Sequence, residues 1–222
     1  MSDKVRVKEL FTSIQGEGPF IGYKQLFIRF CGCNLTCSYC DTDYRTVDSV
    51  EYNLSELIEI SKQNTDCHSV SLTGGEPLLN TGFLKEFLPQ CPLPVYLETN
   101  ATLAGELGEI IDYVDYISAD IKLASCTGGG DLFSEHDRFF TVAMPKVLFA
   151  KIVFDSNITE YEIMQCAKLG AKYNIELILQ PKMNGGNLSV DKEFMEIVLE
   201  KFLKKYKKVR LIPQMHKFLN FQ

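Results

Sequence analysis

The stretch QLFIRFCGCNLTCSYCDT, residues 25–42, joins an apolar run to a loop in which four cysteines fall within ten positions. The run QLFIRFC (25–31) has the length and the aromatic content of a β-strand. Three cysteines follow it in the spacing Cys33-x3-Cys37-x2-Cys40. Thiolates are soft ligands that hold zinc or iron–sulfur clusters, and three of them leave one iron of a four-iron cluster open to a further ligand. We therefore expect a metal centre at the end of this strand.

Side chains in the predicted strand alternate between the two faces of the sheet. Arg29 shares a face with Phe27 and Cys31, while Ile28 and Phe30 point to the other side. A guanidinium makes two parallel charge-assisted hydrogen bonds to a carboxylate, so Arg29 suits binding of an acidic ligand. It can also be an ordinary charge at the edge of a sheet, and the pattern alone leaves both alternatives open.

Length, composition and charge bound the class of protein. The chain has 222 residues, 45% of them hydrophobic, and a formal net charge of −6. These values fit a single domain over residues 1–222 and disfavour nucleic-acid binding, which requires a basic surface. The N-terminal MSDKVRVKELF lacks the apolar core of a signal peptide, and no run approaches the ~20 apolar residues of a membrane span. We expect a cytoplasmic protein without membrane contact, in which clustered cysteines indicate a metal or catalysis rather than disulfides.

Strand-like and helical patterns alternate along the chain, which predicts an α/β fold with parallel strands and crossover helices. The units are too few for a closed eight-stranded barrel, so we expect a partial TIM-like barrel of about six parallel strands. The segment 125–140 is expected to be a lid or a mobile loop. The predicted strands are 25–31, 69–73, 94–99, 115–122, 146–154, 175–181 and 209–213. The predicted helices lie near 53–61, 80–88, 104–112, 158–172 and 191–206.

Unusual motifs directly follow the predicted strands. After the cysteine loop come TGGEP (73–77), ETN (98–100), DIK (120–122) and QPKM (180–183). In parallel α/β sheets the chemistry gathers at the carboxyl ends of the strands. This coincidence predicts an active site at that edge of the sheet.

The cysteine spacing, with Tyr39 before the last cysteine, resembles the signature of the radical S-adenosylmethionine (SAM) enzymes. The resemblance implies a [4Fe-4S] cluster on Cys33, Cys37 and Cys40, whose open iron binds SAM through its amino and carboxylate groups. In that superfamily one-electron reduction cleaves SAM to methionine and a 5′-deoxyadenosyl radical, which abstracts a hydrogen atom. TGGEP resembles the Gly-rich SAM motif, in which glycines let the backbone approach the ligand. In isolation it would predict only a turn leading into a helix.

Five further stretches together resemble the 7-carboxy-7-deazaguanine synthase family over essentially the whole chain. They are SIQGEGPFIG (13–22), FIRFCGCNLTCSYCDT (27–42), TGGEPLL (73–79), ETN (98–100) and PQMHKFLNFQ (213–222). The resemblance implies a radical SAM carbon–nitrogen lyase with a modified, shortened barrel. It implies conversion of 6-carboxy-5,6,7,8-tetrahydropterin to 7-carboxy-7-deazaguanine with release of ammonia, on the route to queuosine and other 7-deazapurines. It also implies regeneration of SAM, a need for Mg2+, a homodimer, and a reductant protein such as a flavodoxin.

The resemblance also implies roles for individual residues. Catalytic roles fall to Glu17, Glu98 and His216. Substrate contacts fall to Ile14, Gln15, Gly16, Arg29, Thr73 and, through the terminal carboxylate, Gln222. SAM contacts fall to Tyr39, Cys40, Asp41, Gly75, Asp120, Ile121, Lys122, Gln180, Pro181, Lys182 and Met183. The Mg2+ contact falls to Thr42, whose hydroxyl is a hard oxygen ligand.

Several of these residues also have ordinary structural interpretations. Thr42 alone would be predicted as a helix N-cap, and Glu98 as a charged residue beginning a loop. DIK stands where many relatives have Ser-Pro-Lys, and Ala101 follows ETN where glycine is usual. The remaining histidines, His68 and His136, are expected at the surface.

Two other functions remain open from the sequence. Another small radical SAM enzyme, such as a glycyl-radical-enzyme activase, would share the cluster and TGGEP but not IQGEG or the QMHK tail. A non-enzymatic four-cysteine metal-binding module would instead need Cys31 as a fourth ligand. Cys31 is one residue from Cys33, which is awkward for converging on one ion, so we expect it to be a small residue that ends the strand.

Overall fold

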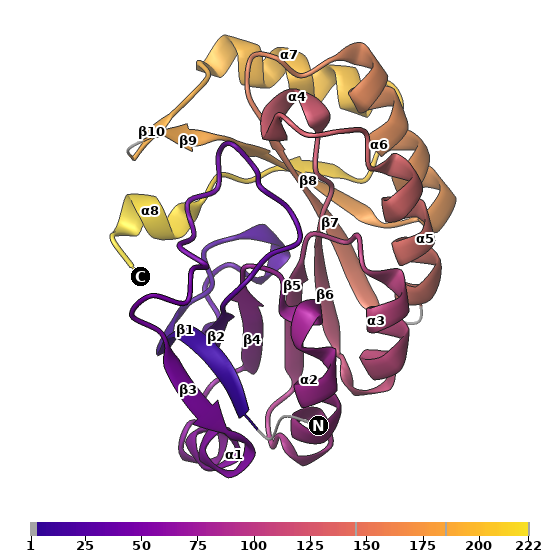
Figure 1. Ribbon diagram of the computed structural model, residues 1–222. Helices are drawn as coiled ribbons and strands as arrows, with labels where there is room; N and C mark the ends of the chain where they lie inside the picture. Colours follow the sequence, from indigo (N-terminus) through magenta and orange to yellow (C-terminus); the bar gives the residue numbers. More distant parts are fainter. Residues whose placement is uncertain (1–3, 145, 185, 222) are drawn as a thin grey trace.

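A computed structural model describes residues 4–144, 146–184 and 186–221. Figure 1 shows a curved sheet with helices along its outer side. In this part of the chain nine strands form one sheet, in the order β11-β8-β7-β6-β5-β4-β2-β1-β3. The nine strands are β1 (Lys4–Ile14), β2 (Lys24–Phe30), β3 (Val50–Asn53), β4 (Ser69–Gly74), β5 (Val95–Thr99), β6 (Tyr116–Asp120), β7 (Val147–Phe154), β8 (Glu176–Pro181) and β11 (Val209–Leu211). A separate two-stranded hairpin pairs β9 (Met183–Asn184) with β10 (Asn187–Leu188).

All neighbouring strands from β2 to β11 run parallel. The predicted α/β fold is therefore confirmed, with seven parallel strands in the described residues where about six were expected. The sheet stays open, since β11 and β3 form its two edges. The strands β1 and β3, which pair antiparallel with each other, were not predicted. Alternation of charged and apolar residues at the start of β1 was the available signal, because Val5 and Val7 are buried and Lys4 and Arg6 are exposed.

Helices connect the parallel strands, as crossover connections require. Two of them begin with a capping box, at Asn53 for α1 and at Thr159 for α6, in which the cap side chain and a glutamate satisfy free backbone amides. The α-helices are α1 (Leu54–Gln63), α2 (Thr81–Phe87), α3 (Ala104–Ile110), α4 (Ala124–Thr127), α5 (Phe133–Ala143), α6 (Glu160–Tyr173), α7 (Lys192–Leu203) and α8 (Met215–Leu219). Short 3-10 helices are η1 (Gly18–Phe20), η2 (Pro77–Asn80), η3 (Leu88–Gln90) and η4 (Ile111–Tyr113). None of the helices described is long and apolar enough to cross a lipid bilayer.

The segment 125–140 is largely helical, so the expectation of a lid or loop there is wrong for most of its length. It contains the end of α4 and most of α5, whose Phe139 and Phe140 are fully buried. The same helix buries His136, which was expected at the surface. The glycine-rich sequence before the helix suggested a loop. The apolar residues of α5 lie on one face of an otherwise polar helix, a pattern that was overlooked beside these glycines.

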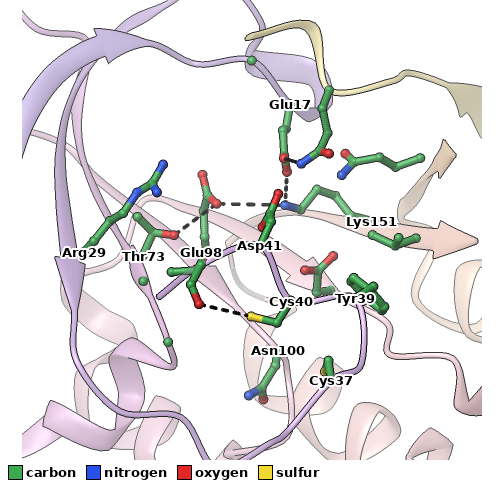
Figure 2. A pocket seen from close by; sticks show the side chains of 18 of the residues that line it. Glu17, Arg29, Cys37, Tyr39, Cys40, Asp41, Thr73, Glu98, Asn100 and Lys151 are labelled. Carbon is green, nitrogen blue, oxygen red and sulfur yellow. Dashed lines mark hydrogen bonds and ion pairs between the residues drawn. The ribbon is translucent and has the colours of Figure 1, made fainter. Parts of the chain in front are cut away.

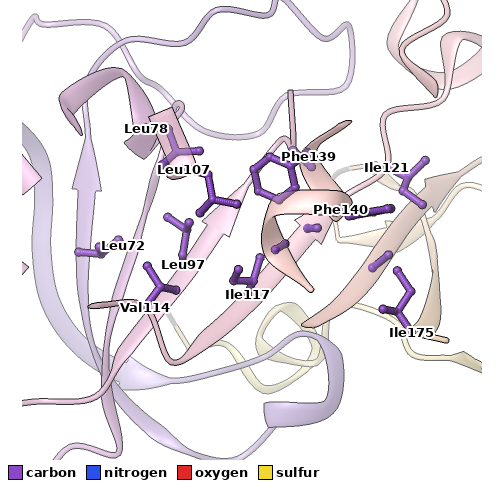
Figure 3. Packing of buried hydrophobic residues seen from close by; sticks show 14 of the residues in the cluster. Leu72, Leu78, Leu97, Leu107, Val114, Ile117, Ile121, Phe139, Phe140 and Ile175 are labelled. Atoms are coloured by element: carbon purple, nitrogen blue, oxygen red, sulfur yellow. The ribbon is translucent and has the colours of Figure 1, made fainter. Parts of the chain in front are cut away.

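The two faces of the curved sheet differ in chemistry because successive strand residues point to opposite sides. Leu72, Leu97 and Ile117 of three neighbouring strands face the outer helices and pack against Leu107 and Phe140 (Figure 3). Each such fully buried side chain contributes about 1.5–3 kcal/mol to stability. The alternate residues face the inner side, where a smaller apolar cluster forms one end of the concave face, made by Tyr96, Phe149 and Ile178. Polar side chains occupy the other end, at the carboxyl edge of the strands.

Glycines in the TGGEP motif let two strand ends approach each other. A Cβ on Gly75 would lie 1.8 Å from the Gly32 carbonyl oxygen, and one on Gly74 would lie 2.4 Å from the backbone of Phe30. The amides of Gly75 and Glu76 donate to the Phe30 and Gly32 carbonyls at 3.1 and 2.9 Å. The motif therefore joins the end of β4 to the start of the cysteine loop. This contact is a second reason for glycine at these positions, in addition to the expected approach of the backbone to a ligand.

We expect Gly75→Ala to destabilise the fold by roughly 1–3 kcal/mol, because the added methyl group meets backbone that cannot move aside. Gly82→Ala is the matched control, since nothing lies within 4 Å of its Cβ position in α2. Alanine there should stabilise the protein by up to about 1 kcal/mol through helix propensity. Urea unfolding followed by circular dichroism measures both. Equal midpoints for the two variants would contradict the close approach at Gly75.

Candidate active site

A cavity of about 360 Å³ lies at the carboxyl edge of the parallel strands. Its wall is formed by inward-facing side chains of β2 and β4 to β8, together with the cysteine loop, the turn after β1 and the C-terminal segment that holds α8. The location is the one predicted from the motifs at strand ends. Figure 2 shows side chains of the lining residues, such as Glu17, Arg29 and Glu98, pointing into one space from segments far apart in the sequence.

The cavity brings together most of the residues that the sequence singled out. Those that line it are Ile14, Gln15, Gly16, Glu17, Arg29, Cys33, Cys37, Tyr39, Cys40, Asp41, Thr42, Thr73, Gly75, Glu98, Asp120, Lys122, Gln180, Lys182, Met183 and His216. Ile121 and Pro181 do not line it, because they alternate with the lining residues Asp120 and Gln180 and are buried on the other face of the sheet. The SAM contacts expected for these two residues stay predictions. Gln222 lies outside the described residues.

The cysteine loop is tied down at several points. Its start is closed by the amide of Gly32, which donates to the Tyr44 carbonyl at 2.8 Å. In its middle, Ser38 donates through its amide to the Thr127 carbonyl at 2.9 Å and through its hydroxyl to the Cys126 carbonyl at 3.0 Å. The segment around α4 therefore supports the loop between Cys37 and Cys40 from below.

The three predicted ligands face the cavity, whereas Cys31 does not line it and its thiol lies 3.7 Å from the Arg45 carbonyl. In the part of the chain described, no group of three or more Cys, His, Asp or Glu side chains converges on a point that would hold a single metal ion. A closed zinc site requires such convergence, whereas a cubane cluster takes one thiolate per iron and spreads its ligands. Three soft ligands that open on one cavity fit the cluster.

The residues after the last cysteine also face the cavity. Thr42 is not a helix N-cap, because no helix begins within the loop, and its side chain is half-buried in the cavity wall. Asp41 forms an ion pair with Lys217 of α8. Asp43 is instead directed to Lys8 and Arg45 at 3.0 and 2.8 Å. Both carboxylates of this trio are thus paired with cationic side chains, whereas Thr42 contributes a neutral hydroxyl to the cavity wall.

Buried polar atoms without a partner mark the far side of the cavity. Oδ1 of Asp120 and Oε1 of Gln180 are buried and have no hydrogen-bond partner among the residues described. The second oxygen of Asp120 accepts from Lys122 at 2.9 Å, and Lys122 also donates to the Tyr39 hydroxyl at 3.3 Å. Buried acceptors without donors are costly unless a ligand satisfies them. A polar molecule with amino groups, as SAM is, fits this wall.

His136 links the ends of two strands beneath the cavity. One ring nitrogen lies 3.1 Å from the Ala101 carbonyl and the other accepts the Lys122 amide at 3.0 Å. Ala101, where the resemblance led us to expect glycine, has a positive φ of 56°, in the left-handed region that glycine adopts most readily. Burial lowers the pKa of His136 to about 4. The imidazole is therefore neutral at pH 7, as its two opposite hydrogen-bonding roles require.

A ring of polar contacts forms the inner wall. The amide of Gln15 donates to Glu98 at 2.8 Å and accepts from the backbone amide of Glu17 at 3.0 Å. Lys151 closes the ring, since its ammonium contacts Glu17 and lies 4.0 Å from Glu98 (Figure 2). Burial alone would raise the pKa of Glu17, but Lys151 and the Gln214 amide lower it to about 2. Glu17 is thus an anion of this wall, held by Lys151 and Gln214. Its predicted catalytic role stays a prediction.

The two ends of the chain interlock at the cavity mouth. The Met215 amide donates to the Gly16 carbonyl at 2.9 Å, and a Cβ on Gly16 would lie 2.4 Å from Nδ1 of His216. Gln214 donates to Glu17 at 2.7 Å. Burial lowers the pKa of His216, which leaves the ring neutral near pH 7. The IQG and QMHK stretches are therefore two halves of one structure.

Arg29 lies on the inward face of β2, as predicted, and lines the cavity with Phe27. Its Nη1 pairs with Glu9 of β1 at 3.1 Å, and the guanidinium lies 5.3 Å from the Phe11 ring centre. A guanidinium carries five N–H donors. One side of the group is therefore held by β1, and a carboxylate ligand would meet the remaining donors.

Sequence reasoning missed Lys151, Gln214 and Lys217 among the lining residues and His136 behind them. A lysine inside the apolar run KVLFAKIVF was a usable signal, since a charge in a buried strand needs a partner. His136 carried no such signal, because its partners are backbone groups of distant strand ends.

Comparisons with known proteins agree with this geometry. The sequence profile of the radical SAM superfamily matches residues 27–127. A 7-carboxy-7-deazaguanine synthase of Geobacter sulfurreducens is 37% identical, with 96% of each chain covered. One of Archaeoglobus fulgidus is 32% identical over 95% of this chain and 96% of its own. The crystal structure of QueE from Escherichia coli has the same fold, with a TM-score of 0.66 at 19% identity over 96% of this chain and 95% of that one.

We expect Cys33→Ser to lose the cluster, because it removes one of the three thiolates that face the cavity. Cys31→Ser should retain it, since that thiol lies outside the cavity. Iron and sulfide contents after anaerobic reconstitution measure the difference. A loss of metal in Cys31→Ser would favour the four-cysteine module instead.

His136 should make stability depend on pH. Its pKa is lowered in the folded state, so its contribution is fully present above the unfolded value of about 6.5 and is lost as the pH falls toward about 4. The slope is about 1.4 kcal/mol per pH unit for one proton. Urea midpoints of the wild type and His136→Phe, measured between pH 4 and 8, should converge at low pH. Parallel curves would contradict a buried neutral histidine.

Proposed function

The chain belongs to the 7-carboxy-7-deazaguanine synthase family of radical SAM enzymes, and we propose on that premise that its cavity performs the family reaction. The substrate is 6-carboxy-5,6,7,8-tetrahydropterin, and the product 7-carboxy-7-deazaguanine forms by ring contraction with release of ammonia. The observation that carries the proposal is the convergence of three cysteines, the GGEP turn and both chain ends on one cavity. An activase of glycyl-radical enzymes would have no use for the interlocked IQG and QMHK stretches.

The cofactors are a [4Fe-4S] cluster, SAM and Mg2+. Cys33, Cys37 and Cys40 would hold the cluster, and Thr42 would supply one oxygen to Mg2+, which keeps water and substrate oxygens for its other positions. Bound together, the cluster and SAM supply a one-electron route to hydrogen abstraction. The protein's own part is to place the substrate and to exclude competing reactions.

The residues of this chain divide that work. Arg29 would bind the substrate carboxylate with the donors that Glu9 leaves free. Glu98, beside Thr73, would accept hydrogen bonds from the heterocycle. The neutral ring of His216 and the segment around it would close the mouth against water. Asp120 and Gln180 carry the buried acceptors that would meet SAM.

Gln15, expected to contact the substrate, lines the cavity and also contacts other side chains of its wall. Both hydrogens of its side-chain amide are engaged, by Gln25 at 2.9 Å and Glu98 at 2.8 Å. Its backbone amide donates to the Tyr23 carbonyl at 2.8 Å, and its carbonyl accepts from the Gly22 amide at 2.9 Å. We propose that Gln15 orients Glu98, while Ile14 and Gly16 border the substrate.

The setting of the enzyme follows the same proposal. A low-potential reductant protein such as a flavodoxin would supply the electron, and a homodimer is proposed from the resemblance to the family. A cytoplasmic location suits three reduced thiolates that must stay free of disulfides.

The deciding test is turnover after anaerobic reconstitution with iron and sulfide. With SAM, Mg2+, a low-potential reductant and 6-carboxy-5,6,7,8-tetrahydropterin, the protein should form 7-carboxy-7-deazaguanine while the SAM concentration stays constant. Cys33→Ser should form none. Cleavage of SAM without this product would leave a radical SAM enzyme but sink the proposed substrate.

A further inference from the structure

The burial of Lys151 in the cavity wall is not explained by hydrophobic packing. Lys151 lies in the middle of β7, with Asp120 of β6 and Ile178 of β8 as its register neighbours. Only 6% of its side chain is exposed. Burying an ammonium is costly unless carboxylates surround it. A hydrophobic residue would fill the same place in the strand at no such cost.

The contacts of Lys151 are with two carboxylates that come from opposite sides of the cavity. Glu17 follows β1 and forms the close ion pair, while Oε2 of Glu98, on β5, lies 4.0 Å from the ammonium. Gln15 bonds to both of these acidic residues and completes the ring. Lys151 is the cation of this ring, and its ammonium faces both carboxylates.

The two oxygens of Glu98 are held unequally. Oε1 accepts from Gln15 at 2.8 Å and lies 3.4 Å from the Ser71 hydroxyl. Oε2 has the Thr73 hydroxyl at 3.4 Å and Lys151 at 4.0 Å. Figure 2 shows Glu98 between Thr73 and Lys151. An ionised carboxylate oxygen with only long contacts keeps lone pairs for a ligand.

We propose that Lys151 is a positioning residue that holds Oε2 of Glu98 toward the cavity, where this oxygen accepts N–H donors of the heterocyclic substrate. The inference rests on the proposed function, because it takes a nitrogen heterocycle as the ligand. Glu17 balances the remaining charge of the ammonium and fixes the lysine side chain from the other side.

The other ionisable groups nearby support a dependence on pH. Asp120 of β6 is paired with Lys122, Tyr96 lies on β5 and His216 faces Glu17 from α8. Although burial lowers the pKa of Lys151, the carboxylates Asp120, Glu17 and Glu98 raise it well above its usual value. Without the ammonium these acids would face one another, and mutual repulsion would raise a carboxyl pKa toward neutrality. A protonated carboxyl is a poorer acceptor for N–H donors than an ionised one.

Substrate binding, measured without reductant so that no turnover occurs, tests the proposal. The reconstituted protein with Mg2+ is titrated anaerobically with 6-carboxy-5,6,7,8-tetrahydropterin between pH 6 and 9. Lys151→Met should bind about tenfold or more weakly at pH 6, a loss that shrinks as the pH rises, since each unit of pKa shift corresponds to a factor of about ten. The double variant Glu17→Gln/Lys151→Met restores the charge balance and should recover thermal stability. With one facing acid removed, the dependence of its affinity on pH should be weaker than in Lys151→Met. Its affinity should still stay below that of the wild type, because Glu98 lacks the cation that orients Oε2.

Lys172→Met is the control, because it removes a lysine that is also paired with a carboxylate, Asp137 at 2.6 Å, but lies outside the cavity lining. Its affinity relative to the wild type should not vary with pH. Lys151→Met with wild-type affinity at every pH, or a double variant that regains full affinity, would overturn the inference alone. A wild-type protein that does not bind this pterin would overturn the proposed function and the inference with it.

Discussion

The junction between the end of β2 and the end of β4 is the constraint on which the rest of the site depends. Gly75 and Glu76 donate to the carbonyls of Phe30 and Gly32, and only glycine fits at Gly75, where a Cβ would lie 1.8 Å from a backbone oxygen. The cysteine loop begins at that junction, so its ligands are placed relative to the sheet by backbone contacts. A loop anchored this way can hold a cluster without a fourth protein ligand.

Glu76 extends the junction to the next strand. Its buried carboxylate accepts from the Thr99 hydroxyl and the Asn100 amide, each at 2.8 Å. Burial raises its pKa to about 7, which opposes ionisation, while these donors favour the charged form. Asn100 in turn donates to Asn34 of the cysteine loop at 2.7 Å. His136 then ties the following turn to β6. A chain of buried polar contacts thus fixes the motifs of three strands against one another.

The inner face uses charge where the outer face uses packing. Lys151 and Lys122 are each nearly buried and each neutralised by carboxylates of the cavity. Buried ion pairs contribute little net stability, because desolvation offsets the attraction. Their value lies in orientation: carboxylates held on fixed strands present the same oxygen to every ligand. The C-terminal segment joins this network through Gln214 and Lys217, so the cavity mouth is completed only when both chain ends are in place.

The sequence by itself determined the parallel α/β order and the edge of the sheet where the site lies, and it predicted the three cysteine ligands. Period-2 alternation and the spacing of motifs are local properties, and parallel strands bring their ends to one edge. Only the tertiary structure decided that Lys151 pairs with Glu17 and Glu98, that His136 is buried, and that Gly16 accommodates His216. These contacts join residues distant in the chain, and many use backbone groups that every residue carries. The helix α5, which follows a glycine-rich run, is likewise stabilised by the packing of Phe139 and Phe140 against the core rather than by local helix propensity.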